Sequence, residues 1–395
     1  MKSAKLIIDL QFGSTGKGLI AGYLAKRDNP DTLITAWAAN AGHSYIDSNG
    51  RIFIHTMLAN GVVSDNLKQI IIGPGSLINP DSLIKELTSV EDLLIGRDVK
   101  IIIHPHAAVI SQKHVDEEQG PMTKIGSTKK GVGAAMIDRI RRDPEHNNVA
   151  CNVLHDHPIL SRFIATVSEY NAAMDRAEIV QIEGAQGYSL SMYHGMYPYT
   201  TSRDVTPAQI FADCGIPMSW WPNTEVIGTM RTFPIRVANR FDDKGQQVGY
   251  SGNCYPDQQE LRWEDLGISP ELTTVTRLPR RIFTLSQIQL EEAIRQCSVD
   301  SIFLNFVNYC RDEAELADMM AMVTQAIIKG DVLAGICYMG FGPNDGDVLE
   351  MTESTSILEI VERWKNTAHY PVWVKDRQNK YQEAVNRQSV IGIND

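Results

Sequence analysis

Short hydrophobic segments rich in β-branched residues recur along the chain. They occupy residues 5–10, 32–37, 69–72, 99–103, 179–182, 302–306 and 334–338. Within each segment the apolar residues follow one another with little polar alternation, a pattern typical of strands that are buried on both faces of a parallel sheet. The pattern therefore predicts a central, mostly parallel β-sheet.

Helical patterns lie between several of these segments. Apolar residues at three- and four-residue spacing predict helices over 161–177, 287–296 and 313–328, and Asn79 followed by Pro80 indicates the cap of a helix at 82–87. A further helix is expected at 357–364, in a C-terminal tail over 352–395, whereas the polar stretch 239–269 gives no assignment. Alternating strands and helices without a linker favour one large α/β domain over 1–395.

Composition and charge exclude several classes of protein. Of the 395 residues, 43% are hydrophobic and 22% charged, which is typical of a globular protein, and the net charge of −11 argues against a nucleic-acid-binding surface. No apolar run approaches the length of a membrane span or forms a secretory signal. The six cysteines contain no C-x-x-C pair, which predicts neither zinc nor disulfides and suits a cytoplasmic location.

A glycine loop follows the first predicted strand. Residues 13–18 read GSTGKG, and residues 19–26 fit a helix. Backbone N–H groups at such a strand-to-helix turn, together with the helix dipole and Lys17, favour phosphate binding. The nucleotide-kinase loop has four residues between its glycines and a Ser or Thr after the Lys, so this spacing differs from it. A tight turn carrying a surface lysine is the alternative interpretation.

Four further motifs follow the loop in order. They are NAGH at 40–43, IGST at 125–128 followed by Gly131 and arginines within 139–142, EGAQG at 183–187, and HGMYPYTTS at 194–202. From about residue 5 to 343 the chain resembles the adenylosuccinate synthetase family, whose fold is α/β and similar to that of P-loop NTPases. These enzymes phosphorylate O6 of a purine nucleotide with a nucleoside triphosphate, and aspartate then displaces the phosphate.

The resemblance implies a role for each motif. Lys17 and the loop amides would bind the transferred phosphate, His43 would be the general acid at O6, and Ser14 would stand at the position of the family's base; the catalytic set is thus Ser14, Lys17 and His43. The triphosphate-binding set is Gly13, Thr15, Gly16, Lys17, Gly18, Gly42, His43, Ser44, Asn305, Asn308, Gly340, Gly342 and Pro343. The set for the purine monophosphate is Ser14, Asn40, Ala41, Ser127, Thr128, Arg142, Gln186 and Thr201.

The remaining implied sites concern aspartate, magnesium and a second subunit. The aspartate set is Thr273, Thr274, Val275, Thr276, Arg277 and Arg280, and the Mg²⁺ set is Ser14 and Gly42. Arg142 would reach across a homodimer interface to the phosphate in the neighbouring site, although a run of arginines also fits a solvated helix face. No membrane or nucleic-acid partner is expected.

Three departures from the family pattern indicate a particular branch. The family loop reads G-D-E-G-K-G, and its Asp is the base toward N1 and a magnesium ligand; here Ser14 and Thr15 replace the two carboxylates. A serine hydroxyl is a poor base and a weak metal ligand. The loss of these two carboxylate side chains would give space for a 2-amino group on the purine.

The second departure concerns the base of the phosphoryl donor. The family reads guanine with T-K-x-D, whereas residues 305–308 here read NFVN, so that Asn308 replaces the Asp. An amide offers both a donor and an acceptor, which match adenine, so the donor is expected to be ATP or dATP. Residues 340–343, GFGP, resemble the loop that covers this base.

The third departure lies in the aspartate loop. An ungapped alignment puts Leu278 where the family has an Arg that contacts both aspartate and the ribose 2′-hydroxyl, while Arg277 precedes it. Loss of that polar partner favours a deoxynucleotide. An inserted residue that restores the ordinary Arg is the alternative.

The three changes together resemble the phage-type 2-aminoadenylosuccinate synthetases, ligases that join aspartate to C6 of dGMP to make a precursor of 2-aminoadenine. Two alternatives stay open: an ordinary synthetase that acts on IMP with an altered donor, and a catalytically inactive relative that binds nucleotides. A generic kinase or GTPase is excluded by the loop spacing and by the missing guanine-reading Asp.

Overall fold

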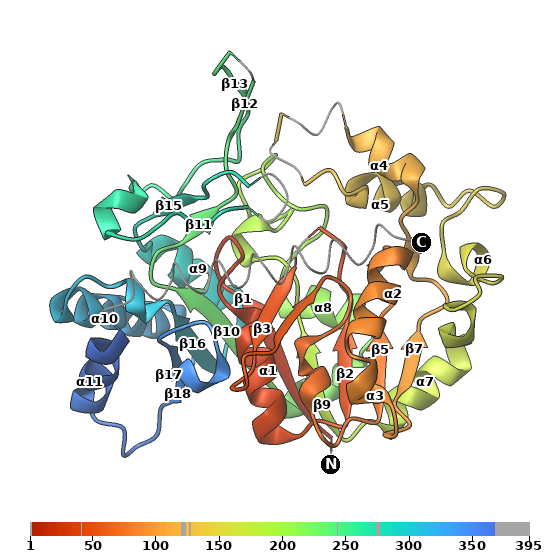
Figure 1. Ribbon diagram of the computed structural model, residues 1–395, viewed down its shortest axis with the longest axis horizontal. Coiled ribbons are helices and arrows are strands. Elements are labelled where there is room, and N and C mark those ends of the chain that lie inside the picture. The colour runs from red at the N-terminus through yellow and green to blue at the C-terminus, as the bar shows by residue number, and fades with distance from the viewer. Residues whose placement is uncertain are drawn as a thin grey trace.

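The computed structural model describes residues 2–40, 42–119, 124–125, 128–242, 244–273 and 277–367. Within these ranges a nine-stranded sheet crosses the molecule in the order β18-β17-β16-β10-β1-β9-β2-β5-β7 (Figure 1). Its strands are β1 (Ser3–Asp9), β2 (Thr32–Thr35), β5 (Gln69–Ile72), β7 (Lys100–Ile103), β9 (Ile179–Glu183), β10 (Thr224–Arg231), β16 (Ser301–Asn305), β17 (Gly335–Gly340) and β18 (Val348–Glu350). Neighbours pair in parallel, apart from the antiparallel pair β17–β18. The carboxyl ends of the parallel strands therefore meet along one edge.

Helices cover both faces of this sheet. The α-helices of the described residues are α1 (Lys17–Asp28), α2 (Pro80–Ser89), α3 (Glu91–Leu94), α4 (Gln112–Glu118), α5 (Val132–Arg141), α6 (Ala150–Val153), α7 (Val167–Arg176), α8 (Pro207–Asp213), α9 (Gln287–Cys297), α10 (Glu313–Gly330) and α11 (Ile357–Thr367). Of these, α4 and α5 lie beyond the carboxyl edge of the sheet (Figure 1). The smaller strands are β3 (His43–Ile46), β4 (Ile52–His55), β6 (Leu77–Ile78), β8 (Ala108–Val109), β11 (Ile235–Arg236), β12 (Arg240–Phe241), β13 (Gln247–Gly249), β14 (Glu260–Leu261) and β15 (Arg281–Phe283).

Alternate residues of β1 enter two separate cores. Leu6 and Ile8 pack in a cluster that includes Leu290 of α9 and Val323 of α10. Ile7 points the other way and packs in a cluster with Leu19 of α1. Burial on both faces explains why this strand is continuously apolar up to its carboxyl end.

The predicted sheet is confirmed, with two strands added: the central β10 and the edge strand β18. Each of the seven predicted segments coincides with a strand, with ends that differ by at most two residues. The sequence analysis did not identify β10, which lies between β1 and β16. Its sequence, TEVIGTMR, mixes Glu, Gly, Thr and Arg with apolar residues, and therefore lacks the uninterrupted hydrophobic run of the other strands.

The helix predicted over 161–177 begins later than expected. Thr166 caps α7 through a reciprocal pair of hydrogen bonds with Glu169, and Ser161–Phe163 forms a separate 3₁₀ turn. The helix expected at 357–364 is α11, and the remainder of the tail from residue 368 lies outside the described residues. No helix in the described ranges is both long and apolar enough to cross a membrane.

Candidate active site

The glycine loop joins β1 to α1 at the carboxyl edge of the sheet. Three of its residues have left-handed backbone angles: Gly13 (φ 93°), Ser14 (φ 58°) and Gly16 (φ 95°). Gly16 is the N-cap of α1, and a side chain there would overlap the amide of Asn305. Lys17 is the first residue of the helix. The loop therefore presents a helix N-terminus, as an anion site requires.

A buried carboxylate lies beneath this loop. Asp9, the last residue of β1, has no exposed surface. Its Oδ1 accepts the backbone N–H groups of Gln11 (2.9 Å) and Gly13 (3.2 Å), and its Oδ2 accepts Oγ1 of Thr15 (2.5 Å) and Nζ of Lys17 (2.9 Å). One side chain thus bonds to both ends of the loop.

Ser14 and Thr15, the residues in place of the family's carboxylates, differ in their surroundings. Ser14 is exposed, and its carbonyl accepts a hydrogen bond from the guanidinium of Arg231 at 3.2 Å. Thr15 is buried, with its hydroxyl 2.6 Å from that of Thr229 as well as bonded to Asp9. The expectation that both positions open space for the purine is therefore wrong for Thr15, whose side chain points beneath the loop.

His43 reaches the loop from β3. Gly18 allows this approach, because an added Cβ would lie 2.6 Å from the Ser44 carbonyl. Nδ1 of the buried His43 ring lies 2.7 Å from Oε1 of Glu183, at the end of β9, and the ring packs on Trp37 with centroids 4.2 Å apart. Glu183 is held by the backbone N–H of Asn60 at 2.8 Å and has no exposed surface.

The environment of His43 lowers its pKa. Desolvation is the largest cause, and the Lys17 ammonium adds to it, while the hydrogen bond that His43 donates to Glu183 opposes both effects. The carboxylate accepts from Nδ1–H, which fixes the ring's orientation and leaves Nε2 for the substrate side. A carboxylate–histidine pair of this kind suits a proton donor that is oriented before substrate binds.

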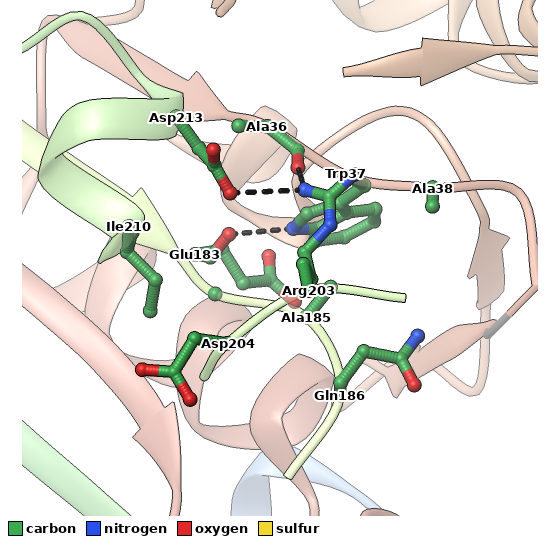
Figure 2. Close-up of a pocket in the computed structure, with 11 residues that line it drawn as sticks. Ala36, Trp37, Ala38, Glu183, Ala185, Gln186, Arg203, Asp204, Ile210 and Asp213 are labelled. Carbon is green, nitrogen blue, oxygen red and sulfur yellow. Dashed lines mark hydrogen bonds and ion pairs between the residues drawn. The ribbon is translucent and has the colours of Figure 1, made fainter. Parts of the chain in front are cut away.

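Two of the residues expected to bind the purine monophosphate, Gln186 and Asn40, contact each other. Nε2 of Gln186 donates to Oδ1 of Asn40 at 2.7 Å, which joins the ends of β9 and β2. A small pocket lies beside them, with the Arg203 guanidinium at its centre, bonded to Asp213 and to the Ala36 carbonyl (Figure 2). Its lining consists of Ala36, Trp37, Ala38, Glu183, Gly184, Ala185, Gln186, Arg203, Asp204, Ile210 and Asp213.

Other members of the monophosphate set lie apart from this pocket's lining or outside the described residues. Thr128 and Thr201 are half-buried. Arg142 is exposed at the C-terminal end of α5 with φ 53°. Ala41 and Ser127 lie outside the described residues.

Asn305 and Asn308, expected to bind the donor, differ in their bonding. The amide of Asn305 is engaged internally, since it donates to the Thr15 carbonyl (3.1 Å) and accepts from the Phe306 N–H (2.8 Å). It therefore connects β16 to the glycine loop and is not free to read a base. Asn308 is buried, and its amide nitrogen has no hydrogen-bond partner among the described residues.

The loop after β17 stands next to these two asparagines. A side chain at Gly340 would overlap the Asn305 amide, and one at Gly342 would lie against the Asp347 carboxylate, so both glycines are required by close packing. Pro343 is half-buried beside them, while Gly42 and Ser44 are exposed next to His43. The predicted donor residues are thus carried by the ends of β1, β16 and β17 and by β3.

The aspartate loop is described only at its two ends. Thr273 and Leu278 pair through their backbones at 2.9 Å, and Arg277 is exposed with φ 54°. The backbone N–H of Arg280 donates to the Glu271 carbonyl. Thr274, Val275 and Thr276 lie outside the described residues.

The sequence analysis assigned no role to three charged residues at this edge: Asp9, Glu183 and Arg231. Arg231 is fully buried, bonds to Glu271 just before the aspartate loop, and stacks on Phe306 with its guanidinium carbon 3.8 Å from the ring centre. A common signal marks all three, because each is a charged residue at the carboxyl end of a strand. Charged groups are almost never fully buried unless they are paired, so such positions merit attention.

Comparisons with known proteins identify the family of this chain. The family model for adenylosuccinate synthetase matches residues 6–149 and 146–317. A protein of Acinetobacter phage SH-Ab 15497, N6-succino-2-amino-2′-deoxyadenylate synthase, is 51% identical over 87% of this chain and 92% of its own length. The same-named protein of Salmonella phage PMBT28 is also 51% identical, over 88% of this chain and 97% of its own.

A solved structure extends the likeness to three dimensions. The cyanophage S-2L succinoaminodeoxyadenylate synthetase (PurZ), bound to dGMP and to dATP as an energy donor, is 42% identical, covers 93% of this chain and 99% of its own, and superimposes with a TM-score of 0.83. The fold class expected from the sequence is confirmed by this match. With a matching family model over most of its length, the loop, the His43–Glu183 pair and the EGAQG turn in place, the chain belongs to the adenylosuccinate synthetase family.

Proposed function

We propose that this protein joins L-aspartate to C6 of dGMP with the hydrolysis of ATP or dATP, giving N6-succino-2-amino-2′-deoxyadenylate, nucleoside diphosphate and phosphate. The observation that carries the proposal is the 51% identity to phage synthases of that name over most of both chains. The exposed Ser14 supports the dGMP substrate, and the buried amide nitrogen of Asn308, which has no hydrogen-bond partner among the described residues, supports the adenine donor.

In the first step N1 of dGMP gives up its proton to water or to a triphosphate oxygen, O6 attacks the terminal phosphorus of the triphosphate, and the nucleoside diphosphate leaves. Charge develops on the transferred phosphoryl group, so cations and N–H donors that are already in place lower the barrier. The Lys17 ammonium and the N–H groups at the start of α1 would supply them. In the second step the amino group of aspartate attacks C6 and phosphate departs with the O6 oxygen.

His43 would donate a hydrogen bond to the phosphoryl group during the first step, and would act as the general acid for the departing O6 oxygen in the second step. In the ligand-free protein, burial lowers the pKa of the ring. A polyphosphate bound beside it adds negative charge, which opposes this effect and favours the imidazolium, while Glu183 keeps Nδ1–H oriented. The ring would therefore take up its proton when substrate binds.

Magnesium fits this site as part of the donor. Among the described residues no cluster of three His, Cys, Asp or Glu side chains forms a protein cage for a metal. Mg²⁺ commonly keeps water and phosphate oxygens as most of its ligands, so the exposed Ser14 hydroxyl and the Gly42 carbonyl would complete a shell that the triphosphate supplies. The ion would neutralise charge on the β- and γ-phosphates.

The protein would act as a homodimer. Arg142 is exposed at the end of α5. Its backbone N–H donates to the Arg139 carbonyl, but within the described residues its side chain makes no hydrogen bond, so its guanidinium is available to the dGMP phosphate of a neighbouring subunit. The neighbouring arginines are engaged within the chain, since Arg141 pairs with Asp138 at 2.7 Å and Arg139 bonds to the Pro74 carbonyl.

The test is a product assay on the purified protein with aspartate, Mg²⁺ and ATP or dATP, in parallel with dGMP and with IMP. Phosphate release together with a product of the mass of succinylated 2-aminodeoxyadenylate is expected with dGMP. Turnover of IMP alone would make the protein an ordinary synthetase. No turnover of either nucleotide would contradict the proposal and favour an inactive relative.

A further inference from the structure

The proposed reaction assigns no role to Asp9, the buried carboxylate beneath the glycine loop. Both of its oxygens are engaged by loop donors, so it is not a free base toward N1 of the purine. Asp9 accepts four hydrogen bonds from the two ends of the loop. Two go to backbone N–H groups at the start of the loop, and two go to side chains at its end.

The position of Asp9 is itself held by the next strand. Asp9 of β1 is paired in register with Thr229 of β10. The Thr229 hydroxyl lies 2.6 Å from the Thr15 hydroxyl, which donates to Asp9. This chain of two hydroxyls ends on the carboxylate, so the loop is fixed to two hydrogen-bonded strands of the sheet.

The bonds of Lys17 show what this arrangement does for a phosphate. An ammonium group has three N–H donors. Lys17 gives one to Asp9 at 2.9 Å and one to the Gln186 carbonyl at 2.9 Å. Its exposed fraction is only 4%. The third donor is therefore fixed in direction and remains for the phosphoryl group.

We propose that Asp9 is the positioning residue of the phosphate site: its carboxylate holds the Lys17 ammonium and the loop N–H groups in the geometry that phosphoryl transfer requires, at the cost of weaker ground-state attraction for the polyanion. The inference rests on the proposed function and deepens it. The carboxylate adds one negative charge next to an anion site, so removing that charge should strengthen the binding of anions while it disorders the donors.

The direction of the change in anion binding distinguishes a positioning role from a purely structural one. Asp9→Asn keeps the size of the side chain and removes its charge. We expect kcat with dGMP, aspartate and ATP to fall about 10²-fold, as a displaced catalytic group does. We expect ADP to bind about three- to tenfold more tightly at low ionic strength, the scale of one unit charge at short range, and this gain to shrink with added salt.

Asp31 provides a matched control. It is also a buried carboxylate, 3% exposed, that accepts backbone N–H groups, including that of Ile179 at 3.0 Å, but it precedes β2 at the opposite edge of the sheet. Asp31→Asn should lower the stability of the fold and leave kcat and ADP binding per folded molecule unchanged. Asp9→Glu, which restores the charge, should recover part of kcat and return ADP binding to the parent value.

The inference is overturned if Asp9→Asn behaves like Asp31→Asn, or if it weakens ADP binding. ADP binding is measured by calorimetry without turnover. A parent protein that binds ADP but converts neither dGMP nor IMP would therefore contradict the proposed function and still leave the charge effect of Asp9 readable.

Discussion

Asn308 places a buried amide nitrogen, unbonded among the described residues, at the end of β16. Asp at this position offers only acceptors, which match the N1–H and amino group of guanine and not adenine. We expect Asn308→Asp to shift the ratio of kcat/KM for ATP over GTP toward GTP by at least about tenfold, the size of one or two base hydrogen bonds.

The neighbouring asparagine is the control for this change. Asn305 is bonded to Thr15 and Phe306, so Asn305→Asp should lower activity with both donors without changing their ratio. An unchanged ratio in Asn308→Asp would show that the base is recognised elsewhere.

His55 links stability to pH. Its ring has no exposed surface, and burial lowers its pKa to about 4, while the nearby Glu183 opposes and His43 adds to the effect. An unfolded chain binds the proton with a pKa of about 6.5. Between about pH 6.5 and pH 4, His55 is protonated mainly in the unfolded state. The contribution of its neutral ring to the free energy of unfolding is therefore complete above about pH 6.5 and is lost as the pH falls toward 4.

The expected size of this effect is measurable. Between pH 7.5 and 5 the ring contributes a loss of about 2 kcal/mol, to which His104, with a pKa also lowered to about 4 by burial, adds in the same direction. Urea unfolding of His55→Gln at the two pH values should show a smaller loss than the parent. If His55→Gln lost as much stability as the parent between the two pH values, the His55 ring would not be a cause of the pH dependence.

At the scale of elements, the turn from β1 into α1 depends on Gly16. Its φ of 95° and its contact with the Asn305 amide exclude a side chain. We expect Gly16→Ala to cost about 1–3 kcal/mol of stability and to lower kcat/KM for ATP about 10²-fold by displacing the loop. Gly50 has φ 82° with open space around it, so Gly50→Ala should bring backbone strain alone and normal kinetics. Equal kinetics in the two variants would contradict the role of the Asn305 contact.

The sequence predicts those helices and strands whose formation depends on residues that are close together in the chain. β5 matches its prediction at both ends because its isoleucines form an uninterrupted apolar run. The helix α9 begins at the predicted residue because its apolar residues have helical spacing, and the structure shows Ser286 as its cap. β10 escaped prediction because its place is set by pairing with β1 and β16, not by its own composition. The same holds for the site: motifs indicate Lys17 and His43, whereas the partners Asp9 and Glu183 emerge only when strand ends are brought together.

At the scale of the whole molecule, the proposed dimer makes a test with two inactive variants possible. His43→Ala should lower turnover about 10²–10⁴-fold, because it removes the proton donor. Arg142→Ala should raise KM for dGMP, so that this variant is nearly inactive when it is assayed at a dGMP concentration far below its KM. In a hybrid of the two, the site that keeps His43 receives Arg142 from the other subunit and is intact.

Co-expression of the two variants should therefore restore about a quarter of parental activity, since half of the dimers are hybrids and half of their sites are complete. Light scattering checks the dimer independently. No recovery in a mixture shown to contain hybrid dimers would mean that Arg142 serves its own subunit.

The parallel arrangement of the sheet has an evolutionary consequence. The candidate contacts for phosphate, purine and donor base are carried by the ends of different strands, β1, β9 and β16, and bonds from Lys17 to the Gln186 carbonyl and from Asn305 to the Thr15 carbonyl connect these ends. A lineage can exchange one ligand for another with little effect on the rest where a side chain lacks such a bond, as at Asn308, whose amide nitrogen has no partner among the described residues. A change at Asn305 alters the phosphate loop as well.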